Sequence, residues 1–362
     1  MPTLLVLVLL LMSTGSAAQA FDPSHFVPLA MTVLRVEAPA VNGQVKVGTA
    51  ITVAPGVVVT SCHVTRETVA VRVVKGAGRW TAEGQFADPE HDLCFLSVPR
   101  WPGRPVRFAE PESLGLYQRV VAMGFTRGAE VSLSEGEITG LHVHDGGRII
   151  QSTSSFSSGA SGGALLDGEG RLVGVLTFRL RGNTDHYFSV PASWVSARLP
   201  IPEDRFLPVD QPGRRRAFWE ADSCCVPYFM RVGGMKSEAR WPELLRLADE
   251  WIVADPYNAD AWFARGLAQA RLGQAREATA ALMRTVGFAP RHADGWYELG
   301  AASIVLGDGD AAGNARDVLA GLDAGRAARL SGLMRGSESA SQPEPDGTPK
   351  DAVDSDASAR PR

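Results

Sequence analysis

The chain has 362 residues, of which 45% are hydrophobic and 21% are charged. This composition is typical of a globular protein and excludes a collagen-like, coiled-coil or multi-span membrane protein. The 36 Lys and Arg residues against 40 Asp and Glu residues give a net charge of -4, far from the strongly basic balance of a nucleic-acid-binding protein. At about 150 residues per domain, the length predicts two domains with further segments outside them.

The N-terminus carries the one long apolar run of the sequence, at residues 4–12, which is too short to cross a membrane as a helix. Small residues follow it, and Ala18-Gln19-Ala20 has them at the two positions that a signal peptidase reads. We therefore expect residues 1–20 to be a signal peptide that is cleaved after about Ala20, although the segment has no Lys or Arg and a buried N-terminal helix is the alternative. Cleavage would give a periplasmic or secreted protein with no transmembrane anchor.

The next part of the sequence, from about residue 44 to 190, is a series of short β runs separated by turns with Gly and Pro. The predicted strands are 47–53, 57–60, 69–74, 92–98, 118–124, 131–140, 148–152, 171–177 and 187–190. Strands at this spacing, with no long amphipathic helix between them, indicate an all-β barrel or sandwich.

A helical pattern with an internal repeat follows the β region. Residues 254–289 share eight identities with the following residues at an offset of 34: Pro256/Pro290, Ala259/Ala293, Asp260/Asp294, Trp262/Trp296, Gly266/Gly300, Leu272/Leu306, Gly273/Gly307 and Ala278/Ala312. The period and these positions resemble the tetratricopeptide repeat (TPR), a helix pair that stacks into a solenoid. The resemblance implies an all-α TPR solenoid whose concave surface binds a protein partner. A generic helical bundle is the alternative.

These patterns divide the chain into five segments: a signal peptide at 1–20, a β domain at 21–200, a linker at 201–220, the repeat domain at 221–333 and a tail at 334–362. Within the repeat domain we expect a degenerate helix pair at 227–233 and 241–254 and a partial capping helix at 312–329. The tail is too poor in apolar residues to bury a core, so we expect it to be disordered.

Three motifs in the β region carry the residue types that a serine nucleophile requires: a base, a carboxylate that orients the base, and backbone donors for an oxyanion. Ser161 lies in a glycine-rich turn, where the amides of Gly159 and Ser161 could form an oxyanion hole. His63 ends one apolar strand and Asp92 opens another. The order His, Asp, Ser is one of the known orders of a catalytic triad.

The segment from Ile150 through the Gly159-Ala160-Ser161-Gly162-Gly163 turn resembles the nucleophile region of trypsin-like serine peptidases of the bacterial HtrA/Deg type. With the His63 and Asp92 motifs, the resemblance extends over about residues 30–200. It implies two six-stranded β barrels with the active site in the cleft between them. It also implies that His63 is the general base and acid, Asp92 its orienting carboxylate and Ser161 the nucleophile.

The same resemblance implies further site residues. Thr177 would border Asp92 and the substrate backbone, Ser155 would lie at the base of the primary pocket with Phe156 beside it, and Thr177, Phe178 and Arg179 would form part of the walls. Because no carboxylate lies at the base, we expect a small or medium apolar side chain before the scissile bond. The alternative is that Arg179 reads an acidic residue.

Two departures from the family pattern bear on regulation. Ala160 stands where digestive enzymes have an aspartate, so we expect activity without N-terminal clipping. No segment resembling a PDZ domain follows the β region.

The four cysteines allow three pairings, between which the sequence cannot choose. Cys62 and Cys94 lie beside the candidate catalytic residues in strands that must approach each other, so they form a possible disulfide, with two buried thiols as the alternative. Cys224 and Cys225 are adjacent, which disfavours a bond between them.

The remaining histidines carry weaker signals. His142 and His144 alternate along a predicted strand and share a face, but no carboxylate or thiol lies at a suitable spacing, so we expect a solvated pair and no metal site. We expect His91 to lie on the surface.

Together these patterns predict a secreted or periplasmic serine endopeptidase that cuts a protein or peptide substrate without a cofactor. Its repeat domain would bind a partner or recruit substrate. The alternative is a catalytically silent adaptor of protease fold whose repeats scaffold a complex.

Overall fold

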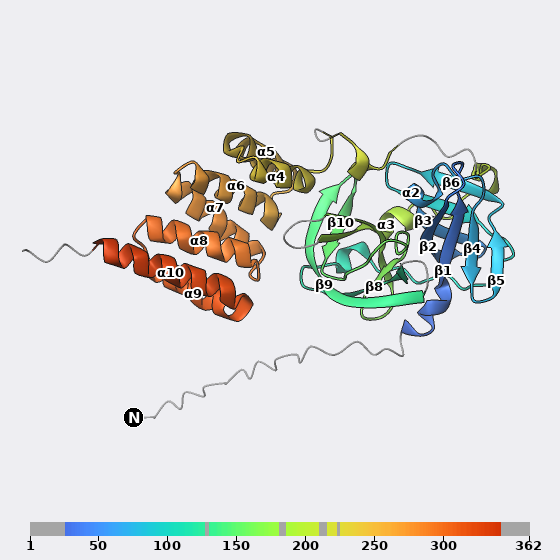
Figure 1. Ribbon diagram of the computed structural model, residues 1–362, viewed down its shortest axis with the longest axis horizontal. Coiled ribbons are helices and arrows are strands. Elements are labelled where there is room, and N and C mark those ends of the chain that lie inside the picture. The colour runs from blue at the N-terminus through green and yellow to red at the C-terminus, as the bar shows by residue number, and fades with distance from the viewer. Residues whose placement is uncertain (1–25, 127–129, 181–185, 210–215, 223–224, 342–362) are drawn as a thin grey trace, which may run out of the picture. The chain divides into compact units, whose positions relative to one another are not determined.

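The computed structural model describes residues 26–126, 130–180, 186–209, 216–222 and 225–341 (Figure 1). The chain divides into two compact units, with the boundary after Pro227. The first unit is built mainly of β-strands and the second of α-helices, so the predicted order of an all-β and an all-α part is confirmed. The predicted signal peptide and residues 342–362 of the predicted tail lie outside the described residues.

The first half of the β unit is a seven-stranded antiparallel sheet in the order β5-β4-β1-β2-β3-β7-β6. Its strands are β1 (Val33–Pro39), β2 (Val45–Ala54), β3 (Val57–Ser61), β4 (Arg72–Lys75), β5 (Gly78–Thr81), β6 (Gly84–Asp88) and β7 (Leu93–Ser97). Their inward side chains form a buried cluster that includes Leu34, Val36, Ala50, Val58, Val73 and Leu96. The expected count of six strands was wrong, because a tight turn at Gly76 adds β5 to the edge of β4.

The second half of the β unit is a closed six-stranded barrel in the order β10-β13-β12-β11-β8-β9. Its strands are β8 (Arg119–Thr126), β9 (Glu130–His144), β10 (Gly147–Ser152), β11 (Ala164–Leu166), β12 (Leu172–Leu180) and β13 (His186–Pro191). Closure buries a second core that includes Val120, Ile138, Ile150, Leu165 and Leu176. The short helix α3 (Ala192–Ser196) follows the last strand.

The pairing of β3 with β7 places the end of β3 beside the start of β7. The two strands are antiparallel, with Ser61 opposite Leu93, so the residues directly after β3 and directly before β7 meet at one edge of the sheet. The short helix α2 (Cys62–Thr65) begins there. Cys62 and Cys94 are joined by a disulfide across this edge, with Cα atoms 4.9 Å apart.

The segment that we expected to be a linker, residues 201–220, packs against the β unit where the structure describes it. Leu207 exchanges two backbone hydrogen bonds with Gln85 of β6, at 2.7 and 2.9 Å. Further along, Ala217 and Phe218 are buried, and Phe218 opens a short 3₁₀ turn, η4 (Phe218–Glu220). The linker prediction was therefore wrong for these residues, because apolar contacts and backbone hydrogen bonds hold them against the β unit.

The second unit consists of helices α4 (Tyr228–Ser237), α5 (Trp241–Ala254), α6 (Ala259–Arg271), α7 (Ala275–Phe288), α8 (Ala293–Val305), α9 (Gly309–Leu322) and α10 (Ala324–Ser341). The bounds of α6 and α7 recur in α8 and α9 at the offset of 34 residues that the sequence identities show. Small residues allow close helix contacts: a Cβ on Gly266 would lie 2.6 Å from Leu282 Cγ.

Two expectations for the end of the chain were wrong. The single capping helix at 312–329 is divided between α9 and α10, because the chain turns at Asp323, whose side chain accepts a hydrogen bond from the Arg326 amide at 2.9 Å and caps α10. The predicted disordered tail from residue 334 is helical up to Ser341. Among the described residues, no helix combines the length and apolar character that a membrane crossing requires.

Candidate active site

His63 and Asp92 meet at the edge where β3 ends and β7 begins. The His63 Nδ1 atom lies 2.8 Å from Asp92 Oδ2, and the His63 backbone amide donates to Asp92 Oδ1 at 2.9 Å. A third bond runs from the Cys62 amide to the Asp92 carbonyl at 3.1 Å. Because one carboxylate holds both the ring and the backbone of His63, the imidazole has a defined orientation.

Asp92 is a buried carboxylate, with only 1% of its surface exposed. Its φ of 58° lies in the left-handed region, which aspartate tolerates better than most residues. Burial alone would raise the pKa of Asp92, but attraction to His63 and hydrogen bonds from the His63 ring, the Thr177 hydroxyl and the His63 amide outweigh it. The pKa of Asp92 is therefore held below its ordinary value, and the group is ionised at neutral pH.

Thr177, in β12, contacts both Asp92 and Ser161. Its hydroxyl donates a short hydrogen bond to Asp92 Oδ2, and its carbonyl accepts one from Ser161 Oγ at 3.4 Å. The structure thus brings His63, Asp92, Thr177 and Ser161 into one hydrogen-bonded chain. Within the described residues, no hydrogen bond joins His63 directly to Ser161.

The turn that carries Ser161 depends on glycine. Gly159 has φ 96° and Gly162 has φ 84°, and a Cβ on Gly162 would lie 2.1 Å from the Thr49 carbonyl oxygen. Thr49 of β2 fixes the turn from outside: its amide donates to the Ser161 carbonyl at 2.8 Å and its hydroxyl to the Gly159 carbonyl at 2.7 Å. These contacts use the carbonyl groups of the turn.

Two amides of the same turn remain available. Over the described part of the chain, neither the Gly159 nor the Ser161 N–H donates a hydrogen bond to another protein group, whereas the following amide, of Gly162, donates to the Leu176 carbonyl at 2.7 Å. Two unused amides that flank a serine hydroxyl are the donors that an oxyanion requires.

The residues expected to shape the primary pocket lie on two elements. Ser155 is exposed, and both its amide and its hydroxyl bond to the Ser134 hydroxyl, at 2.9 and 3.0 Å. Phe156 packs 5.3 Å from the ring of Tyr187, and Tyr187 pairs with Arg179 across β12 and β13. Arg179 is partly buried.

Phe178, the remaining expected wall residue, is buried and stacks on Phe188, with ring centroids 4.8 Å apart. A further aromatic neighbour, Trp219, is not among the residues predicted from the sequence. Its indole lies 5.3 Å from the Phe178 ring and meets the His63 ring edge-on at 5.5 Å. The signal that could have found it is the aromatic pair Phe218-Trp219 in a segment otherwise rich in polar and charged residues.

Two histidine predictions were wrong. His91 is buried rather than on the surface, and its two ring nitrogens lie 2.9 Å from Asp88 Oδ2 and 2.7 Å from Asp145 Oδ2. Burial lowers the pKa of His91, but these carboxylates outweigh it, so the net shift is upward. His142 is also buried, with Nε2 3.0 Å from Gln151 Oε1. Among the described residues, no group of three or more potential metal ligands occurs.

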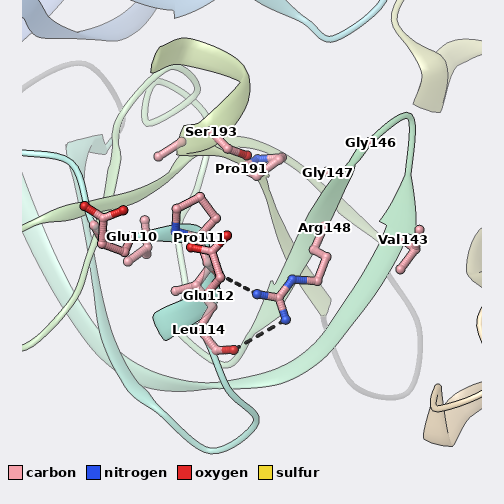
Figure 2. Close-up of a pocket in the computed structure, with 13 residues that line it drawn as sticks. Glu110, Pro111, Glu112, Leu114, Val143, Gly146, Gly147, Arg148, Pro191 and Ser193 are labelled. Atoms are coloured by element: carbon pink, nitrogen blue, oxygen red, sulfur yellow. Dashed lines mark hydrogen bonds between the residues drawn. The ribbon is translucent and has the colours of Figure 1, made fainter. Parts of the chain in front are cut away.

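A pocket of about 690 Å³ lies on the closed six-stranded barrel, and none of the residues expected to be catalytic line it (Figure 2). It is formed by the turn η2 (Pro111–Ser113), the β9–β10 hairpin and the start of α3. Arg148 crosses it and donates to the backbone carbonyls of Pro111 and Leu114, as the dashed lines in Figure 2 show. Because this arginine binds carbonyls of the same barrel, its observed role is to hold the turn.

The β unit that carries this site is similar to a trypsin-like peptidase domain. Residues 48–175 match the family model of the trypsin-like peptidase domain, and His63, Asp92 and Ser161 all lie in the matched range. The chain therefore contains a trypsin-like peptidase domain, followed by the helical unit.

The curated relatives include HtrA/DegP proteases. The chain is 28% identical over 158 residues to the periplasmic serine endoprotease DegP of Salmonella typhimurium, a match over 41% of this chain and 33% of the relative. It is 27% identical over 150 residues to DegP of Escherichia coli, over 39% and 32% of the two chains. It is also 26% identical over 152 residues to the anti-sigma-I factor RsgI9 of Acetivibrio thermocellus, over 41% and 21%. The chain thus spans about a third or less of the length of these relatives.

Similar solved structures include the active form of the Rv3671c protease from M. tuberculosis, at 23% identity and a TM-score of 0.47 over 55% of this chain and 92% of that one. Another is the HtrA-type protease AlgW with a tripeptide, at 20% identity and a TM-score of 0.44 over 49% and 62%.

Proposed function

We propose that this protein is a serine endopeptidase in which Ser161 is the nucleophile, His63 the general base and acid, and Asp92 the carboxylate that orients His63. The observation that carries the proposal is the hydrogen-bonded chain from His63 through Asp92 and Thr177 to Ser161. The DegP relatives are named serine endoproteases, which supports the same reaction type.

The reaction begins with attack of Ser161 Oγ on the carbonyl carbon of the scissile peptide bond. The hydroxyl turns from the Thr177 carbonyl to His63 Nε2, which takes its proton as the C–O bond forms. The carbonyl oxygen becomes an oxyanion and accepts hydrogen bonds from the Gly159 and Ser161 amides. His63 then gives the proton to the leaving amine as the C–N bond breaks, which leaves an acyl ester on Ser161.

Water completes the cycle. His63 takes a proton from the water molecule as it attacks the ester, and returns it to Ser161 Oγ as the acid product leaves. Asp92 stays ionised throughout, because its pKa lies below its ordinary value. It fixes the proton of the neutral ring on Nδ1, keeps Nε2 free to accept, and stabilises the imidazolium once it forms.

The specificity, compartment and partner belong to the same proposal. The absence of a carboxylate at Ser155 and the aromatic contact of Phe156 with Tyr187 favour a small or medium apolar side chain before the scissile bond. The Cys62–Cys94 disulfide is compatible with an oxidising compartment such as the periplasm. The 34-residue recurrence of α6–α7 in α8–α9 supports a TPR-type solenoid that binds a protein partner.

The test is hydrolysis of a fluorogenic peptide library by the full chain and by Ser161→Ala and Asp92→Asn. We expect kcat to fall by about 10⁴ in Asp92→Asn, the loss typical of a triad whose histidine adopts the wrong tautomer. Ser158→Ala, an exposed neighbour in the same turn, is the control and should retain wild-type rates. If the wild type and Ser161→Ala show equal rates, the protein is not a serine peptidase and the adaptor alternative gains support.

A further inference from the structure

Residues 216–222, which we call the strap, cross the β unit beside His63. The strap is anchored at Phe218, which is 6% exposed and donates its amide to the Glu90 carbonyl at 2.9 Å. The Phe218 ring lies 4.9 Å from His144 and 5.9 Å from Phe178. Burial of this apolar ring stabilises the position of the strap against the β unit.

A second anchor follows two residues later. Glu220 forms a two-pronged ion pair with Arg66, at 2.6 and 2.7 Å, although 154 residues separate them in sequence. The hydrogen bonds from Arg66 hold the pKa of Glu220 below its ordinary value. Because Arg66 directly follows α2, which carries His63, the ion pair ties the strap to the element that positions the candidate base.

Trp219 lies between these two anchors, so its position is determined from both sides. Its indole stacks on Phe178 with an interplanar angle of 21° and meets the His63 ring at 86°. The Nε1–H of Trp219 is buried and has no hydrogen-bond acceptor among the described residues. The indole therefore contributes its ring surface rather than a hydrogen bond.

The strand β12 indicates how a peptide would pass this indole. β11 pairs with one edge of β12, but only as far as Val175, while β13 pairs with the other edge. Among the described residues, the first edge of β12 therefore has no strand partner at residues 177–180. An extended peptide can add to such an edge through backbone hydrogen bonds. Since successive side chains of an extended peptide point to opposite faces, the residue before the one at the primary pocket would point away from that pocket.

We propose that Trp219 is a specificity-determining residue that closes the substrate groove between His63 and Phe178. It limits the second residue before the scissile bond to a small side chain such as Ala or Gly. The inference rests on the proposed peptidase function and adds a determinant from outside the residues of the matched family model, which end at residue 175.

The experiment compares two peptides that differ only in Ala or Leu at that position, with the full chain as wild type, Trp219→Ala and Trp219→Phe. We expect the wild type to prefer Ala, and Trp219→Ala to reduce the Ala-to-Leu ratio of kcat/KM at least tenfold by accelerating the Leu peptide. Trp219→Phe is the matched control, because it keeps a ring and loses no hydrogen bond, and it should keep most of the preference.

Labelling of Ser161 by a fluorophosphonate separates the two proposals. If the variants are labelled but the Ala-to-Leu ratio is the same in wild type and Trp219→Ala, the specificity proposal is wrong while the peptidase function stands. If kcat/KM increases by the same factor for both peptides in Trp219→Ala, the strap obstructs the groove without selecting between side chains, and the proposal is again wrong. Absence of both labelling and hydrolysis in folded wild type overturns both.

Discussion

Replacement of Thr177 by Val tests how the structure keeps Asp92 ionised in the protein interior. The two side chains have nearly the same shape, so the substitution removes the hydroxyl that donates to Asp92 Oδ2 and leaves the packing in place. Thr177 is buried, so water cannot readily replace the lost donor. The other donors to Asp92, the His63 ring and amide, remain.

A hydrogen bond to a charged group contributes about 1.5–3 kcal/mol, so we expect the free energy of unfolding to fall by that amount at neutral pH. For a unit of about 200 residues this corresponds to a decrease in Tm of roughly 3–12 °C. Because the pKa of Asp92 is lowered by folding, ionised Asp92 contributes stability above its ordinary pKa of about 3.9, and that stability is lost as the pH falls through the lower folded value. The difference between wild type and Thr177→Val should therefore shrink in acid.

The assay is thermal unfolding followed by circular dichroism at a series of pH values. Thr68→Val is the control, since its buried hydroxyl donates to a neutral carbonyl, that of Thr65, at 2.6 Å. We expect the control to lose about 0.5–1.5 kcal/mol with no dependence on pH. Equal losses in Thr177→Val and Thr68→Val at every pH would refute the account of Asp92.

Three further outcomes are expected. The pKa of His91 is raised by folding, so the contribution of His91 to stability is complete below its ordinary pKa of about 6.5 and is lost as the pH rises through the folded pKa. His91→Gln should remove this decline in a plot of Tm against pH. An unchanged plot would contradict this role of His91. Gly266→Ala should lower the free energy of unfolding, measured in urea, by about 1–3 kcal/mol, because the added Cβ overpacks the helix contact. At Gly313 a Cβ meets no atom within 4 Å, so Gly313→Ala should raise the free energy of unfolding by about 0.5–1 kcal/mol, the usual gain of Ala over Gly in a helix. Replacing Cys62 and Cys94 together by Ala opens a loop with a sequence separation of 32, which should lower the free energy of unfolding by about 3–4 kcal/mol in the same assay. An unchanged free energy of unfolding would show that the disulfide does not constrain the unfolded chain.

The sequence predicted the parts of the fold that depend on local patterns. The apolar run before His63 and the one after Asp92 predict two strands, and their pairing brings the two residues together. Strand β1 was missed although Leu34, Val36 and Ala38 alternate with Arg35 and Glu37. Strand β11 has only three residues, all buried, which is too short for periodicity to distinguish a strand from a loop.

The rest of the site depends on contacts between distant residues, which local patterns do not record. Residues 216–220 of the strap do not follow the linker prediction, because their anchors, Glu90 and Arg66, lie more than a hundred residues before them in the chain. The sequence does not predict the burial of His91, because that burial depends on charge partners from other elements, such as Asp145 at the β9–β10 turn. Such burial becomes favourable only when the partner charges are brought together by the fold.

The measurement that tests the central claim most directly is the mass of the intact chain after reaction with a fluorophosphonate. The account predicts one adduct, located at Ser161 by peptide mapping, with no adduct in Ser161→Ala and a greatly reduced rate in His63→Ala. A folded wild-type chain that forms no adduct, or forms it at another serine, would contradict the assignment of Ser161 as an activated nucleophile.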